Sequence, residues 1–137
     1  MRKSFTKAER LCQQYWIDSI FQQGYAFSVF PFKILVSQNP IVNSPHQILI
    51  TVSKRNFKRA VDRNAIKRRI REGYRLQKQS MPVARSYHVV FIYIAKEMLS
   101  SEIIHKKIQD AMTLLTSHET KIINAQPIAS IPREKKI

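Results

Sequence analysis

Residues 47–78 read QILITVSKRNFKRAVDRNAIKRRIREGYRLQK and join two contrasting segments. The first seven residues are mostly aliphatic and β-branched, which predicts a strand whose alternate side chains face one way. Residues 58–77 carry apolar residues at helical spacing, which predicts an amphipathic helix. From Lys54 to Lys78, eleven lysines and arginines stand against two acids, a net charge of +9. A strand followed by a strongly cationic helix therefore organises the fold and indicates a polyanionic partner, RNA above all.

The whole chain shows the same imbalance of charge. Its 137 residues contain 24 Lys and Arg and 9 Asp and Glu, a formal net charge of +15, while 44% of the residues are hydrophobic. This length predicts one domain with one modest core. Uncompensated charge opposes compaction, so we expect an anionic partner to cover it. Nucleic acid fits better than an anionic membrane, because no segment approaches the roughly 20 apolar residues of a spanning helix.

Cysteine and histidine usage points away from a disulfide-bonded or metal-binding protein. Cys12 is the only cysteine, which permits no internal disulfide and no cysteine-based metal site. The four histidines show no metal-ligand spacing, so we expect no metal site. The first seven residues carry positive charge without an apolar run behind it, unlike a secretory signal. The cytoplasm is therefore the expected location.

Before the basic helix, the sequence predicts one helix and two strands. Residues 7–22 carry apolar side chains at near-helical spacing, and Gly24 is placed to end that helix. Residues 25–36 are rich in aromatic and β-branched side chains and contain one proline, which predicts a single strand that is bent or lies at a sheet edge. A turn-rich loop over 37–45 follows. If this strand and the strand at 47–53 are neighbours, that loop makes them an antiparallel hairpin.

After the basic helix, the sequence predicts one strand and one helix. Residues 86–95 are apolar on both faces of a strand, so we expect this strand at the centre of a sheet. Ser100 is placed to cap a helix whose core stripe comprises Ile104, Ile108, Ala111, Met112 and Leu115. Residues 1–123 are expected to form the single domain and residues 124–137 a flexible basic tail. The order helix, strand, strand, helix, strand, helix, with room for one further short strand, predicts an α+β protein built as a two-layer α/β sandwich.

The predicted basic helix separates its cations from its apolar residues. At 100° per residue, one arc of about 140° is almost entirely cationic or polar and holds Arg63, Asn64, Lys67, Arg68, Arg71, Tyr74 and Arg75. The opposite arc is mainly apolar and can pack on a sheet. Four cations on the first arc repel one another at i,i+4 spacing, so RNA docking explains the arrangement better than a solvated face does. Tyr74 could stack on a base or pack across arginine stems.

These residues resemble a known family, the bacterial ribonuclease P protein subunit. Its signature is matched by Ser53-Lys54-Arg55 after a strand, then Ala60-Val61-x-Arg63-Asn64-x-x-Lys67-Arg68-x-x-Arg71-Glu72. The resemblance extends to Phe5-Thr6-Lys7-Ala8-Glu9-Arg10-Leu11, Phe21-x-x-Gly24 and Val89-Val90-Phe91-Ile92, and covers about residues 5–116. One position departs from the pattern: the family usually has arginine two residues after Arg63, where this chain has Ala65. Arg69 is a candidate to substitute for it.

The resemblance implies a function in which the protein does not perform the cleavage. In this family the large RNA subunit is the catalyst and uses Mg²⁺ to remove the 5′ leader from precursor transfer RNA. The resemblance therefore implies no catalytic residue and no cofactor bound by the protein alone, with Mg²⁺ held mainly by the RNA. It also implies a ribosomal-protein-like fold with a left-handed β-α-β crossover. The residues expected to dock on the RNA subunit are Arg63, Asn64, Lys67, Arg68, Arg71 and Arg75.

The resemblance further implies a cleft between the first helix and the sheet that holds the single-stranded leader and raises the affinity for substrate and Mg²⁺. Single strands bind grooves that combine cations with exposed aromatic rings. Phe21 matches a family cleft aromatic, and Phe32 and Tyr93 qualify if their strand faces point outward. Lys54 and Arg55 could clamp leader phosphates. The alternatives are that the three rings belong to the core and that the two cations are ordinary solvated charges.

Two other classes of function share part of this pattern. A general basic RNA-binding or ribosome-associated protein would have a similar fold but prefer no particular RNA. An independent nuclease fits poorly, because nine scattered acids offer no cluster able to hold two metal ions. We therefore expect an RNA-binding subunit of ribonuclease P. Its expected partners are ribonuclease P RNA and the precursor 5′ leader, with no membrane and no small-molecule substrate.

Overall fold

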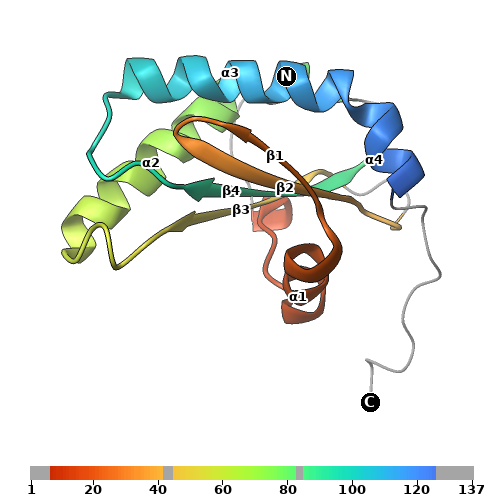
Figure 1. The fold of residues 1–137 in the computed structure, drawn as a ribbon, viewed down its shortest axis with the longest axis horizontal. Coiled ribbons are helices and arrows are strands. Elements are labelled where there is room, and N and C mark those ends of the chain that lie inside the picture. Colours follow the sequence, from red (N-terminus) through yellow and green to blue (C-terminus); the bar gives the residue numbers. More distant parts are fainter. Residues whose placement is uncertain (1–6, 42–44, 83–84, 126–137) are drawn as a thin grey trace.

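The computed structural model describes residues 7–41, 45–82 and 85–125 of the chain (Figure 1). Its elements, in order, are η1 (Lys7–Glu9), α1 (Gln14–Gln23), β1 (Tyr25–Val29), β2 (Phe32–Gln38), β3 (Gln47–Val52), α2 (Ala60–Gln77), η2 (Lys78–Ser80), β4 (Tyr87–Tyr93), α3 (Ser101–Ser117) and α4 (Glu119–Ala125). Figure 1 shows α2 and α3 on one side of the sheet and α1 on the other. The predicted α+β class and the helix-on-sheet architecture are confirmed.

The sheet has four strands in the order β1-β2-β4-β3. β2 pairs antiparallel with both β1 and β4, whereas β3 pairs parallel with β4. The prediction that β4 is a central strand is confirmed. Because α2 connects two parallel neighbours, β3, α2 and β4 form a β-α-β unit. The left hand of this crossover stays a prediction from the resemblance.

Residues 25–36, predicted as one strand, belong to two. β1 and β2 pair from Tyr25 with Val36 to Val29 with Phe32, and the chain turns between them. The apolar and aromatic residues continue up to and beyond this turn, so their pattern alone does not mark the end of the first strand. The conditional hairpin with residues 47–53 does not form, because β4 lies between β2 and β3.

The first helix begins later than the sequence predicts. Residues 7–9 form a short 3₁₀ turn, and Arg10 then bridges to Ile48 in a parallel arrangement. The Leu11 amide donates to the Ile48 carbonyl at 2.9 Å, and the Leu11 side chain is buried. This segment runs along the edge of β3 because burial of Leu11 on the sheet outweighs local helix propensity. The sequence pattern also does not predict α4, whose Ile122 is fully buried.

The main core lies between the sheet and the two long helices. From α2 it receives Ile66, Ile70, Gly73 and Tyr74, and from α3 the whole predicted stripe Ile104, Ile108, Ala111, Met112 and Leu115, which is confirmed. The Ser100 hydroxyl accepts the Ile103 amide at 3.3 Å, which confirms the predicted cap of α3. α2 and α3 approach closely at Gly73, where an added Cβ would lie 2.7 Å from the Ile108 Cδ1.

A second, smaller cluster fills the space under α1 on the other face of the sheet. It consists of Leu11, Ile20, Leu35 and Val90, with Trp16, Ile17, Leu49 and Ile92 packed against it. The sheet is therefore covered on both faces, more extensively on the side of α2 and α3. Within residues 7–41, 45–82 and 85–125, no helix is long and apolar enough to cross a lipid bilayer.

Candidate nucleic-acid interface

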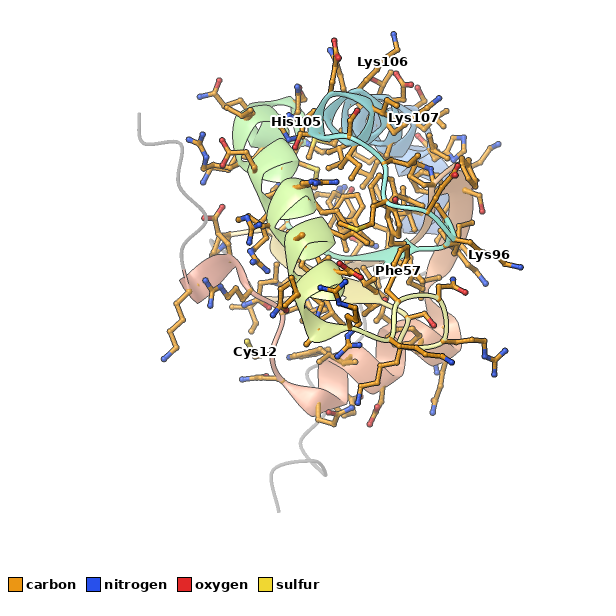
Figure 2. The ribbon with its side chains drawn as sticks, turned by 90° about the vertical axis from the view of Figure 1, so that its left-hand side faces the viewer. Cys12, Phe57, Lys96, His105, Lys106 and Lys107 are labelled. Carbon is orange, nitrogen blue, oxygen red and sulfur yellow. The ribbon has the colours of Figure 1, made fainter. Side chains whose placement is uncertain are left out.

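The outer face of α2 carries several cations at helical spacing. Figure 2 views the molecule from the side on which α2 lies in front. Asn64 and Arg68 are exposed on this helix, and Lys67 and Arg71 are half-buried beside them. Among the described residues, Lys67, Arg68 and Arg71 form no salt bridge with an acid. The structure therefore brings these four predicted RNA-docking residues together on one accessible surface.

Partial burial, and after it the nearby positive charges, shift the pKa of Arg71. Its pKa is lowered by partial burial first, and then by the neighbouring charges of Arg10 and Arg68. Such mutual repulsion means that an anion placed here would be attracted by several guanidinium groups at once. A surface of this kind suits an anionic partner such as phosphate.

The other two predicted docking cations, Arg63 and Arg75, form hydrogen bonds within the protein. Arg63 donates through Nη1 to the Phe57 carbonyl at 2.8 Å and to the Lys58 carbonyl at 3.0 Å. It thereby ties the loop before α2 to the helix. Arg75 donates through Nε to Glu72 at 3.1 Å, one turn away on the same helix. Any RNA contact by these two side chains has to compete with, or add to, these hydrogen bonds.

The helical wheel misplaced Tyr74. Tyr74 is 1% exposed and lies in the main core, so the prediction that it stands among the RNA-facing residues is wrong. Burial, and secondarily the charge of Glu9, raise the pKa of this phenol. Because both the sheet and α3 cover α2, the buried arc is rotated towards Tyr74 and leaves Val61 exposed. Arg69, which the wheel placed within the apolar arc, donates to the Leu99 carbonyl at 2.7 Å, so its guanidinium is held towards α3.

A second cationic surface lies where β3 and β4 end. Lys54 and Arg55 are exposed in the turn after β3, where the Ser53 hydroxyl accepts the Arg55 amide at 3.0 Å. With Lys96 they line an open hollow of about 860 Å³. Parallel neighbours end at the same edge of a sheet, so the loop after β4 lies beside the turn after β3. Sequence reasoning missed Lys96, because only the parallel pairing of β3 with β4 brings it to this place.

The predicted aromatic cleft is only partly assembled. Phe21, on α1, is 49% exposed, but Phe32 and Tyr93 are 0% and 1% exposed in the main core. The prediction that Phe32 and Tyr93 contact a leader is therefore wrong, and the core alternative is correct. Their register explains this: Phe32 pairs directly with Tyr93, which puts both rings on the sheet face that α2 and α3 cover.

The opposite sheet face, on the α1 side, presents different residues. Lys33 pairs with Ile92, which in turn pairs with Thr51 of β3, so these three side chains share one row across the sheet. Lys33 is exposed and the other two are half-buried. Side chains alternate between the two faces of a strand, so Lys33 lies on the opposite face from Phe32. The sequence could have identified Lys33 as accessible only if the covered face of the sheet had been known. Elsewhere in the described ranges, no group of three or more His, Cys, Asp or Glu side chains could hold a metal ion.

Comparisons with known proteins agree with this geometry. The family model for ribonuclease P matches residues 5–116. The ribonuclease P protein component of Porphyromonas gingivalis W83 is 35% identical over 101 residues, which is 72% of each chain. That of Chromohalobacter salexigens is 28% identical over 133 residues, covering 95% of this chain and 96% of the relative.

Solved structures share the fold. The RNase P protein from Thermotoga maritima superposes with a TM-score of 0.66 at 23% identity, covering 77% of this chain and 96% of that one. The Staphylococcus aureus RNase P protein gives a TM-score of 0.64 at 24% identity, covering 80% and 96%. At these identities the likeness concerns the arrangement of helices and strands.

Proposed function

This chain belongs to the ribonuclease P protein family, and from that premise we propose that it docks on ribonuclease P RNA through α2 and binds the 5′ leader of precursor transfer RNA beside α1. As a ribonuclease P protein component, it is a subunit of the endoribonuclease that processes transfer RNA. A general RNA-binding protein without a role in cleavage is not favoured. The observation that carries the proposal is the group of Lys67, Arg68 and Arg71 on α2, which form no salt bridge within the described residues.

Docking on the RNA subunit uses the charge of α2. Arginine presents a planar fork of donors that matches two phosphate oxygens, and neighbouring lysines add point charges. Arg68 and Asn64 reach solvent, so they can contact an RNA backbone without any change in the protein. Each phosphate neutralised releases counterions, which favours binding and makes it dependent on salt.

Leader binding uses the surface around α1 and the strand ends. Phe21 offers an exposed ring on which a base can stack, and Lys33 lies on the same face of the sheet as α1. At the strand ends, Lys54, Arg55 and Lys96 can hold successive phosphates around the open hollow. The combination of a stacking ring with cations suits a single strand.

Catalysis and metal binding are assigned to the RNA subunit, as the family resemblance implies. We propose that Mg²⁺ is held mainly by that RNA and that the cations of this chain act indirectly. Because they neutralise phosphates of both RNAs, they reduce the repulsion that Mg²⁺ must otherwise screen. The protein would thereby raise the affinity for substrate and lower the Mg²⁺ concentration needed.

The first test is the affinity of the protein for ribonuclease P RNA as a function of salt concentration. Arg68→Ala should weaken binding and reduce the slope of log K against log salt by about 0.7–0.9, the value of one phosphate contact. Lys106→Ala is the matched control, since it removes one positive charge from an exposed position of α3. An unchanged slope for Arg68→Ala, or an equal change for both variants, would contradict docking through α2.

A further inference from the structure

A groove of about 400 Å³ lies beside α2 on the side that leads to α1. Its walls are α2, through Lys67 and Arg71, and the segment before α1, through Arg10 and Cys12; the edge strand β3 forms its floor. Figure 2 shows Cys12 on one side of α2 and Lys96 on the other. The groove is therefore separate from the hollow that Lys54, Arg55 and Lys96 line.

The fold leaves polar backbone groups at the floor of this groove. Within residues 7–13, the chain forms a parallel bridge to β3 at Arg10 and Ile48, where the Leu11 amide donates to the Ile48 carbonyl, and it then turns away into α1. Along a strand, the backbone groups of successive residues point to opposite sides, so those of every second residue point to the same side. The amide and carbonyl of Ile50 therefore point to the same side as those of Ile48, towards the groove and away from β4.

The walls of the groove are strongly cationic. Lys67 and Arg71 stand one helical turn apart on α2, and neither forms a salt bridge within the described residues. Arg10, on the other wall, is close enough that its charge lowers the pKa of Arg71, after the larger effect of burial. Glu9, beside Arg10 in sequence, holds the Lys78 ammonium at 3.0 Å.

We propose that this groove binds a phosphodiester of ribonuclease P RNA between Arg10 and the pair Lys67 and Arg71. The Ile50 amide supplies a further donor at the floor. The RNA-docking surface then extends from α2 across the edge of β3 to the segment before α1. The inference rests on the proposed docking through α2. The RNA subunit is favoured over the leader because Lys67 and Arg71 continue the α2 surface, whereas α2 separates the groove from the hollow at the strand ends.

A binding experiment separates this inference from the proposed function. Arg10→Ala should weaken binding of ribonuclease P RNA by about fivefold and reduce the salt slope by about one contact, whereas Arg10→Lys should keep most of the affinity. Combined with Arg71→Ala, the loss should be less than the product of the two single losses, because both side chains hold one phosphate. Thermal unfolding of each variant checks that the segment before α1 still packs on β3.

The outcomes are distinguishable from those of the first test. If Arg68→Ala weakens binding and Arg10→Ala does not, this inference fails and docking through α2 stands. If neither variant weakens binding, both fail. If Arg10→Ala leaves assembly intact but lowers the affinity of the assembled enzyme for precursor transfer RNA, the groove serves the substrate and the assignment to the RNA subunit is overturned.

Cys12 offers a second readout that needs no substitution. It is the only cysteine of the chain and is exposed at the groove. Its rate of alkylation by iodoacetamide should fall at least about tenfold when ribonuclease P RNA occupies the groove, since the thiol is then covered. The reaction should recover its full rate at a salt concentration that releases the RNA. An alkylation rate unchanged in the complex would overturn the inference.

Discussion

Phe21, Phe32 and Tyr93 illustrate at the residue scale how burial separates aromatic side chains of similar chemistry. Sequence alone made all three candidates for stacking on RNA bases. The structure leaves Phe21 49% exposed and buries the other two almost completely. Which face of β2 and β4 is covered depends on how the strands pair and where the long helices pack. No local pattern around Phe32 or Tyr93 contains that information.

The first residue-scale prediction concerns Phe21→Ala. It should leave thermal stability and assembly with ribonuclease P RNA nearly unchanged, but reduce the preference for precursor over mature transfer RNA, because a stacked base is worth about 1–3 kcal/mol. The measurement is the ratio of the two affinities for the assembled enzyme. Phe32→Ala is the control for a core ring and should cost about 3–5 kcal/mol of folding free energy. If Phe21→Ala destabilises the protein to a similar degree, the ring belongs to the packing of α1.

The second residue-scale prediction concerns His88, which is fully buried under α1 with its ring 5.3 Å from that of Trp16. Neither ring nitrogen has a hydrogen-bond partner among the described residues, and burial lowers the pKa of His88 to about 4. The unfolded chain, with a histidine pKa near 6.5, binds this proton before the folded chain does. Stability should therefore fall as pH drops from about 6.5 to 4, by up to about 3 kcal/mol from this residue.

His88→Leu isolates that contribution. The variant removes two unpaired buried nitrogens, so it should be at least as stable as the parent at pH 7 and lose less stability towards pH 4. Urea unfolding at several pH values measures both effects. Parallel curves for the two proteins would show that His88 does not cause the loss, and a clear loss of stability at pH 7 would show that its nitrogens are paired.

At the scale of elements, the long periodic segments were predictable and the pairing between distant segments was not. α2, α3 and β4 follow local patterns of apolar residues, and their positions agree with the sequence to within a few residues. Residues 7–13 carry a helical pattern as well, yet the bridge from Arg10 to Ile48 replaces the helix there. That contact joins segments far apart in sequence. Lys96 could not be predicted as part of the candidate site for the same reason. It lies beside Lys54 and Arg55 only because β3 pairs parallel with β4.

The element-scale prediction concerns the contact between α2 and α3. A Cβ at Gly73 would lie 2.7 Å from the Ile108 Cδ1 and 2.8 Å from the His105 Cδ2, so a branched side chain does not fit. Gly73→Val should lower the free energy of unfolding, and so destabilise the protein, by about 1–3 kcal/mol through overpacking. This loss is expected although valine has a better helix propensity than glycine. Asn64→Val, on the exposed side of the same helix, is the control and should stay within about 0.5 kcal/mol. Equal effects in chemical denaturation would contradict the close approach.

At the scale of the whole molecule, the fold distributes its positive charge over several surfaces around one four-stranded sheet. The formal net charge of +15 predicted a polyanionic partner but not the surfaces that meet it. The structure distributes cations over α2, the groove beside it and the hollow at the strand ends. Such an arrangement can hold two RNA segments at once, the RNA subunit on α2 and a single strand beside α1. Binding of both RNA segments at once is the central part of the function that we propose.

The most direct test is reconstituted cleavage of precursor transfer RNA by a bacterial ribonuclease P RNA at low Mg²⁺, with and without this protein. We predict correctly placed 5′ cleavage only when the RNA and the protein are both present, and no cleavage with the protein alone. The stimulation should be greater for precursors that carry a leader long enough to reach the α1 side. Absence of rescue, together with equally tight binding to unrelated structured RNAs, would contradict this function, as would cleavage by the protein alone.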